Sequence, residues 1–153
     1  MKNYILNTLF FFAFTHKLLA SEVVVLPSEA NYLAPDGLEV YLGAETNNAG
    51  DAGIARFEAP VGFVSLAVTH KTVDEIWYCI SGEGIIAVKD NALEKWKEVS
   101  LRPGVSVSLP LGVHFQTKNT GKDKLVILGT TTPRWPNDPE EAKPVPPYWN
   151  ISK

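Results

Sequence analysis

The stretch GFVSLAVTHKTVDEIWYCISG, residues 62–82, decides the fold of this chain. Its first half alternates in polarity, and one expected face collects Val64, Leu66, Val68 and His70. Its second half holds an apolar run, residues 76–80, that ends at Ser81 and Gly82. Alternation with a period of two residues, closed by a turn signal, is typical of β-strands with one buried face. The stretch therefore predicts two strands and no helix.

The same pattern continues on both sides of this stretch. Turn signals occur at Pro35-Asp36-Gly37 and at Asn47-Asn48-Ala49-Gly50, with short apolar runs between and after them. The further strands that we expect are residues 22–26, 38–42, 54–57, 85–88, 95–99, 105–109, 113–117 and 125–128. Many short strands at regular spacing predict an all-β sandwich or barrel.

Composition narrows the class of protein. The chain has 153 residues, of which 45% are hydrophobic and 20% are charged, and this size and balance predict one globular domain. A formal net charge of -3 argues against a nucleic-acid-binding surface. The single cysteine, Cys79, excludes a disulfide framework within the chain and any cysteine-rich zinc module.

The first twenty residues form a separate segment. Lys2 is followed by an apolar run from Tyr4 to Thr15, and Ala20 stands before Ser21. This order is typical of a secretory signal peptide, with cleavage expected near Ala20/Ser21 and the product secreted or periplasmic. An uncleaved interfacial anchor is the alternative. The run is too short to cross a bilayer, which takes about 20 apolar residues, so we do not expect an integral membrane protein.

Two spaced motifs carry a family resemblance. The first has Gly62, five residues, Val68-Thr69-His70, four residues, Glu75, six residues and Gly82. The second has Gly104, five residues, Pro110-Leu111-Gly112, two residues, Phe115, three residues and Asn119. Together they resemble the two conserved motifs of the cupin superfamily, and the surrounding text is similar to small single-domain type-2 cupins with no settled function.

The resemblance implies a double-stranded β-helix, the jelly-roll or cupin barrel. On this reading residues 1–20 are the signal peptide, 21–132 form the barrel with a motif core at about 62–129, and 133–153 form a C-terminal arm. The arm holds six of the eleven prolines, together with Trp135, Tyr148 and Trp149. Prolines favour an extended conformation. We expect the arm to pack its aromatic rings on the barrel, to cover a pocket mouth, or to cross to a second subunit.

The resemblance also implies a possible metal centre. In metal-binding cupins three histidines and one glutamate hold iron, manganese, nickel or zinc. By position, the four corresponding residues here are Val68, His70, Glu75 and Phe115, so two of the four are apolar. His114 is the adjacent candidate for a third ligand. Strand alternation turns it outward if Phe115 points inward, and a one-residue bulge would reverse this.

Three interpretations of these residues stay open. His70 and Glu75 form a hydrogen-bonded pair in which the carboxylate favours a charged imidazole, or they bind a metal with His114, or they only pack. Trp77 shares the strand parity of Glu75 and is expected either to wall a ligand cavity or to pack in the core, whereas Asp74 is expected in solvent. The candidate ligand-binding residues are His70, Glu75, Trp77, His114, Phe115 and Gln116.

Three functions follow from these interpretations. The first is an exported binding module that holds a small organic ligand in the barrel, with no tightly bound metal. The second is an enzyme, either a metal-dependent dioxygenase or isomerase or a metal-free proton-transfer catalyst that uses His70 and Glu75. The third is a structural barrel that acts as a homodimer, because exposed sheet edges need covering. Whether the chain is an enzyme stays open at this point.

Overall fold

The computed structural model describes residues 29–30, 32–34, 36–45, 51–90, 94–136 and 138–151. The expected signal peptide, its cleavage point and the expected strand at residues 22–26 lie outside these ranges. The strands are β1 (Tyr32–Leu33), β2 (Glu39–Glu45), β3 (Gly53–Ala59), β4 (Val68–His70), β5 (Asp74–Ser81), β6 (Gly84–Asp90), β7 (Lys95–Leu101), β8 (Ser106–Leu109), β9 (His114–Asn119), β10 (Leu125–Thr132) and β11 (Ala142–Pro144). The described part of the chain contains no helix long and apolar enough to span a membrane.

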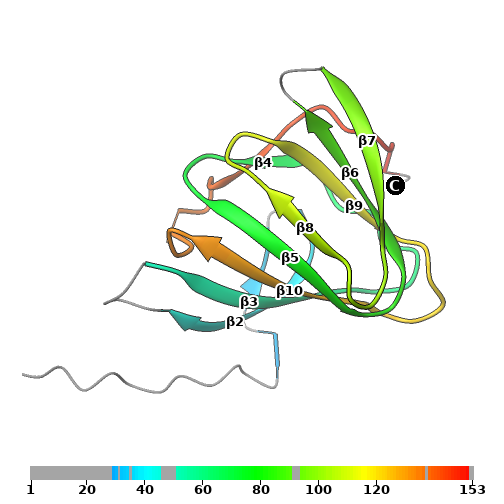
Figure 1. Cartoon of the computed structure of the whole chain (residues 1–153), viewed down its shortest axis with the longest axis horizontal. Helices are drawn as coiled ribbons and strands as arrows, with labels where there is room; N and C mark the ends of the chain where they lie inside the picture. Colours follow the sequence, from blue (N-terminus) through cyan, green and yellow to red (C-terminus); the bar gives the residue numbers. More distant parts are fainter. Residues whose placement is uncertain are drawn as a thin grey trace, which may run out of the picture.

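Two antiparallel sheets pack face to face and enclose the core (Figure 1). The first sheet has the order β1-β2-β3-β10-β5-β8, and the second has the order β11-β4-β9-β6-β7. Strands that are distant in sequence are neighbours, since β10 lies between β3 and β5 and β9 lies between β4 and β6. The prediction of an all-β jelly-roll barrel is confirmed.

Alternation along the central strands explains the core. On β5, Glu75, Trp77 and Cys79 are buried, whereas Ile76 and Tyr78 face outward. Strand β10 repeats this pattern, and its buried side chains meet those of β5 and β9 between the sheets. The apolar side chains buried in the core include Leu38, Val68, Trp77, Ile86, Leu109, Phe115, Leu125 and Ile127. Burial of this one face is the main force that holds the two sheets together.

The segment before β4 departs from the expected strand. Leu66, expected on the core face, is 42% exposed, while Ser65 and Ala67 are buried. Consecutive backbone N–H groups bond to different parts of the chain here. The Ser65 N–H donates to the carbonyl of Thr117, and the Leu66 N–H donates to the carbonyl of Asp36. Regular alternation begins only at Val68, so the expected strand at residues 62–70 shortens to β4.

The turn between β5 and β6 explains two glycines in different ways. Gly82 has a φ of +80°, the left-handed conformation expected for this turn. Gly84 does not share this conformation. A Cβ atom on Gly84 would lie 2.7 Å from the carbonyl oxygen of Lys118, so close packing against β9 is what favours glycine there.

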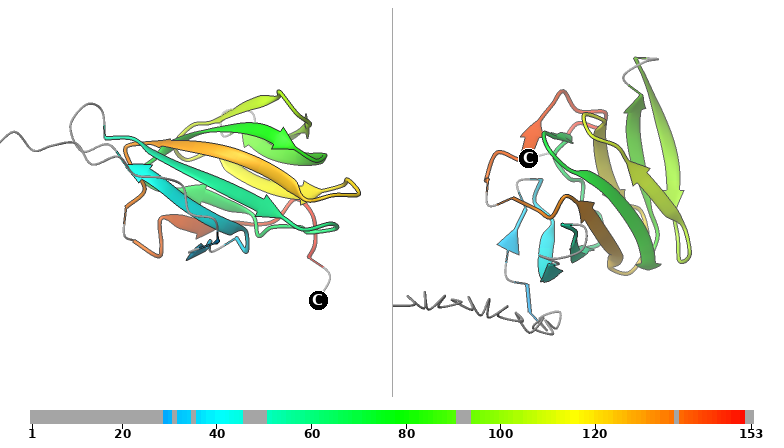
Figure 2. Two further views of the ribbon diagram at one scale, coloured as in Figure 1. Left: turned by 90° about the horizontal axis from the view of Figure 1, so that it is seen from below. Right: turned by 60° about the vertical axis from the view of Figure 1, so that its left-hand side comes forward.

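The C-terminal segment folds back along the barrel of its own chain (Figure 2). Strand β11 pairs with β4, and the buried Glu141 carboxylate accepts hydrogen bonds from the backbone N–H groups of residues 71, 72 and 73. Farther along, the backbone N–H groups of Tyr148 and Trp149 donate to the side-chain amide oxygen of Gln116. The arm is therefore tied down at two points, one near β4 and one over β9.

Candidate functional site

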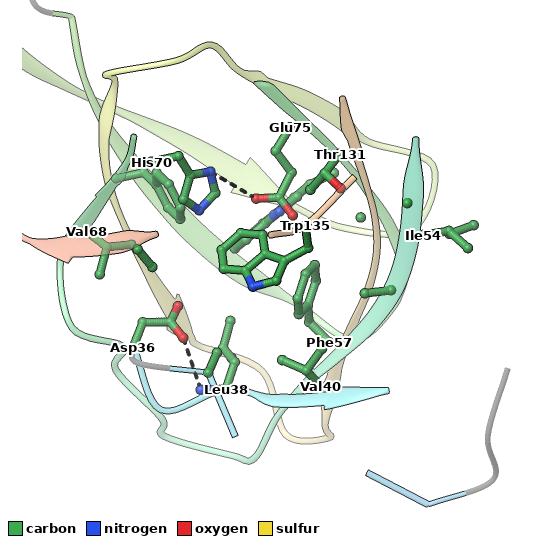
Figure 3. Close-up of a pocket in the computed structure, with 17 residues that line it drawn as sticks. Asp36, Leu38, Val40, Ile54, Phe57, Val68, His70, Glu75, Thr131 and Trp135 are labelled. Atoms are coloured by element: carbon green, nitrogen blue, oxygen red, sulfur yellow. Dashed lines mark hydrogen bonds and ion pairs between the residues drawn. The ribbon is translucent and has the colours of Figure 1, made fainter. Parts of the chain in front are cut away.

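A cavity of about 50 Å³ lies between the two sheets, and Val68, His70 and Glu75 of the first motif line it. Its walls come from β2, β3, β4, β5, β9, β10 and β11, and from the segments that hold Asp36 and Trp135. Figure 3 shows the polar side chains of His70, Glu75 and Asp36 among apolar and aromatic side chains. A water molecule needs about 10–15 Å³ on the same measure, so the cavity has room for a few waters or for a small organic group.

His70 and Glu75 form the polar centre of this cavity. His70 ends β4 and Glu75 lies near the start of β5, in the other sheet, and both side chains are buried. The His70 Nδ1 atom lies 3.6 Å from Glu75 Oε2, which is longer than a hydrogen bond. Within the described part of the chain, His70 Nδ1, Glu75 Oε1 and the indole Nε1 of Trp77 make no hydrogen bond of normal geometry, although the indole lies near enough to Glu75 to influence its pKa. Buried polar atoms without partners are uncommon in folded proteins, so these three are free to bind a ligand or water.

Burial decides the charge of this pair. It raises the pKa of the Glu75 carboxyl to about 8, a shift that the Trp77 indole opposes and the Asp36 carboxyl reinforces. Burial also lowers the pKa of His70 to about 4, and the charge of Glu141 opposes that shift only in part. The expectation of a charged imidazole is therefore corrected, because the loss of hydrating water on burial outweighs the attraction of the Glu141 carboxylate. Between about pH 4 and pH 8 the pair as a whole carries no net charge.

Asp36 is a third polar group in the cavity, and the sequence analysis missed it. Its side chain is buried, and its Oδ1 accepts a hydrogen bond of 3.2 Å from the backbone N–H of Leu38. Burial raises the pKa of Asp36 to about 6, and the hydrogen bond from Leu38 opposes this shift. At neutral pH the group is mostly ionised. In the sequence, Asp36 stands out only as part of the turn signal Pro35-Asp36-Gly37, which gives no indication of burial.

Aromatic rings form a continuous wall around the polar centre. The ring centroid of Phe115 lies 5.1 Å from that of His70 and 5.6 Å from that of Trp77, both nearly perpendicular. Phe57 extends the wall, with its centroid 5.5 Å from that of Trp77. Trp135 of the arm completes it, because its ring stands edge-to-face with His70 at 5.2 Å. The arm therefore supplies one wall of the cavity.

Gly129 on β10 makes room for this arrangement. A Cβ atom at this position would collide with the Phe57 ring and would lie 2.9 Å from Glu75 Oε1. Real Cβ atoms essentially never approach a neighbour that closely. A larger residue would therefore push Phe57 or Glu75 out of the cavity wall.

His114 and Gln116 lie outside the cavity. Phe115 points inward, so the two residues beside it on β9 point away, as strand alternation requires and with no bulge to reverse it. His114 lies near Lys89 and Glu94, and burial with the charge of Lys89 lowers its pKa. Gln116 is fully buried under the arm, where it bonds to Ser65, Tyr148 and Trp149. Both were expected to bind ligand, and neither is among the residues that line the cavity.

The donor set does not fit the metal that the fold family implies. The expected ligands His70, Glu75 and His114 are not brought together, and no group of three His, Cys, Asp or Glu side chains within the described ranges is arranged to hold a metal ion. The other two family positions hold Val68 and Phe115, whose side chains have no metal-binding atom. A transition metal in an enzyme usually takes three protein ligands, and this cavity offers two of the expected ones.

Comparisons with known proteins agree with the fold. No family model and no curated protein matches the sequence. Oxalate oxidase in complex with glycolate superposes with a TM-score of 0.60 at 20% identity, over 70% of this chain and 56% of the other. CapF of Staphylococcus aureus superposes with a TM-score of 0.60 at 16% identity, over 69% of this chain and 31% of the other.

A third structure, the cysteine peptidase Peruvianin-I from Thevetia peruviana latex, superposes with a TM-score of 0.58 at 17% identity, over 67% of this chain and 66% of the other. The chain thus spans about half the length of the oxalate oxidase that it resembles. Likeness at these identities is a likeness of fold. The cupin superfamily and its small single-domain subgroup therefore stay predictions from the sequence motifs.

Proposed function

We propose, on the premise of this cupin fold, that the chain is an exported binding protein whose barrel cavity holds a small organic ligand without a tightly bound metal. The observation that carries the proposal is the cavity itself, with apolar walls and three unpartnered buried polar atoms on His70, Glu75 and Trp77. Ligand sites are commonly of this kind, mostly apolar with a few polar groups that orient the ligand. Export rests on the first twenty residues alone.

A packing role explains these residues less well. Burying a carboxyl and an imidazole without hydrogen-bond partners costs free energy that apolar side chains of similar size would not cost. The unpartnered atoms of His70 and Glu75 face the cavity, where a ligand can supply the missing partners. A binding role therefore accounts for both the composition and the direction of the polar groups.

Tryptophan fluorescence and thermal stability test the proposal in one experiment. Trp77 and Trp135 line the cavity, so a bound ligand should change their emission and raise the melting temperature. Thr131→Leu narrows the cavity, and Thr130→Leu, the adjacent outward-facing residue of β10, is the matched control. We expect hits from a panel of small organic compounds to lose binding in Thr131→Leu only. Equal binding by both variants would place the ligand elsewhere.

Elemental analysis tests the metal part of the proposal. We expect the purified full-length protein to contain much less than one transition metal ion per chain. Near-stoichiometric iron, manganese, nickel or zinc would overturn it and would favour the metal-dependent enzyme instead. His70→Ala would then decide whether the metal belongs to this cavity, because loss of the metal would assign it to His70.

A further inference from the structure

The chemistry of the cavity wall points to one class of ligand. We infer that the cavity selects a small organic cation, a protonated amine on a short apolar body, whose ammonium group lies between Asp36, Glu75 and the aromatic rings. This inference rests on the proposed binding function and adds the charge of the ligand. Three features carry it, namely the acidic groups, the absence of basic side chains from the described cavity lining, and the aromatic wall.

The first feature is the balance of charged side chains. Two carboxyl groups, Asp36 and Glu75, line the cavity, and no lysine or arginine is among the residues that line it in the described part of the chain. Among the described lining residues His70 is the only other titratable group, and the negative charge of Glu141 acts on it from nearby. A ligand carboxylate would face like charge with no cation to pair with. An ammonium group would find opposite charge on the ionised Asp36 and an acceptor oxygen on Glu75, and its own charge would favour ionisation of Glu75.

The second feature is a buried acceptor that the protein leaves unused. The Glu75 side chain is only 3% exposed, and its Oε1 has no hydrogen-bond partner. Figure 3 shows Glu75 pointing into the cavity beside His70, with Asp36 entering from another wall. His70 Nδ1 is also without a partner. An ammonium group carries three N–H donors, enough to serve these two acceptors and the Asp36 carboxylate.

The third feature is the set of ring faces and edges around the acceptors. Phe57, Trp77, Phe115 and Trp135 surround the cavity. A cation within about 6 Å of an aromatic ring is attracted by the ring quadrupole, and more strongly where water is excluded. The same rings pack well against a short alkyl chain. A cavity of about 50 Å³ limits that chain to a few carbon atoms unless side chains move.

Three probes of nearly equal shape and different charge test the inference, namely propylammonium, 1-propanol and propionate. The readout is the NMR shift of the indole N–H signals of the full-length protein at neutral pH. Trp77 and Trp135 report from the cavity, and Trp96 and Trp149 do not line it and serve as internal references. Each signal is assigned by a single Trp→Phe variant. We expect propylammonium to bind about tenfold more tightly than 1-propanol, as a charge-assisted hydrogen bond allows, and propionate not to bind.

Isosteric variants separate the charge from the shape of the site. Asp36→Asn and Glu75→Gln should each weaken propylammonium binding by about tenfold and leave 1-propanol binding within about twofold, which also shows that the cavity is intact. Asp74→Asn removes a neighbouring carboxylate that is exposed and lies outside the cavity lining, so it should change neither. Equal loss in Asp74→Asn would mean that the cation senses only surface charge and would overturn the inference.

The outcomes distinguish the inference from the proposed function. If 1-propanol or propionate binds as tightly as propylammonium, the cation inference fails while the binding function stands. If no probe shifts Trp77 or Trp135, both fail for ligands of this size. If propylammonium binds and Asp36→Asn and Glu75→Gln leave its affinity unchanged, the two carboxyls do not select it and the inference fails.

Discussion

Replacing Glu75 with glutamine should change how the stability of the fold depends on pH. The folded protein holds a proton on Glu75 up to a pKa of about 8, whereas the unfolded chain releases it at the ordinary 4.5. The folded state therefore binds the extra proton between these two values, and its stability falls as pH rises through them. Each pH unit in this range removes about 1.4 kcal/mol of unfolding free energy.

Two other groups in the cavity titrate in the lower part of this range, below about pH 6.5, and their effects largely offset each other. Asp36 has its pKa raised to about 6, so its ionisation lowers the unfolding free energy of the protein as pH rises from about 4 to 6. His70 has its pKa lowered to about 4 and therefore raises the unfolding free energy as pH rises from about 4 to 6.5. In that range the imidazole is protonated in the unfolded chain and neutral in the folded one. From pH 6.5 to 8, Glu75 acts nearly alone. The wild-type protein should lose about 1–2 kcal/mol over that window.

Urea denaturation followed by tryptophan fluorescence measures the effect at pH 6.5, 7.0, 7.5 and 8.0. The midpoint of the wild-type protein should fall steadily across this series, and Glu75→Gln, which cannot ionise, should give a flat profile within about 0.5 kcal/mol. Asp74→Asn is the matched control, because Asp74 is exposed, and it should keep the wild-type slope. An equal slope in Glu75→Gln would refute the reasoning, since it would show that another group titrates in this window.

Three further predictions test the parts of the fold that build the cavity and its surroundings. Gln116→Ala should lower the unfolding free energy by about 2–4 kcal/mol, because Gln116 makes four buried or half-buried hydrogen bonds. The same change should expose the C-terminal arm to proteolysis, and an arm that stays protected would contradict this. Gly129→Ala should lower the unfolding free energy by more than about 1 kcal/mol through collision with Phe57, and Phe57→Leu in the same chain should recover part of the loss; no recovery would mean that the strain arises elsewhere. Sedimentation should show a dimer that Ile76→Lys with Ile80→Lys converts to a monomer, because both side chains are about half exposed on the outer face of β5; a monomeric wild-type protein would refute this.

The sequence predicts the inner wall of the site well where one strand contributes its own periodicity. On β5 the alternation places Glu75 and Trp77 inside and Asp74 outside, and the structure agrees. On β9 the motif position of Phe115 sets the parity, and His114 follows it outward. In these strands a residue's direction depends on its neighbours in sequence, which is information that one sequence contains.

Three residues take positions that depend on contacts with distant parts of the chain. Asp36 lies in a turn signal, and it is buried because its carbonyl accepts a hydrogen bond from Leu66, far along the chain. Trp135 reaches the cavity because the pairing of β11 with β4 and the Glu141 contacts hold the arm there. Leu66 lies outside because its backbone bonds to that same turn rather than to a continuous strand. Local pattern contains none of these contacts.

The cavity has apolar side chains at two positions where the resemblance implies metal ligands, and it has a carboxyl group from a different part of the chain. Val68 and Phe115 stand where the resemblance implies metal ligands, and they line the cavity as apolar walls. Asp36, from the turn before β2, adds a carboxyl that the two motifs do not contain. Holding Glu75 protonated at neutral pH costs the fold several kcal/mol relative to an exposed carboxyl, since its pKa rises from 4.5 to about 8. That cost is recovered when a ligand with N–H donors and positive charge enters, because the carboxyl then gains the partners that burial removed. The same atoms that make the empty barrel less stable at high pH are therefore those that favour a cationic ligand, so the stability profile and the ligand preference should be lost together in Glu75→Gln.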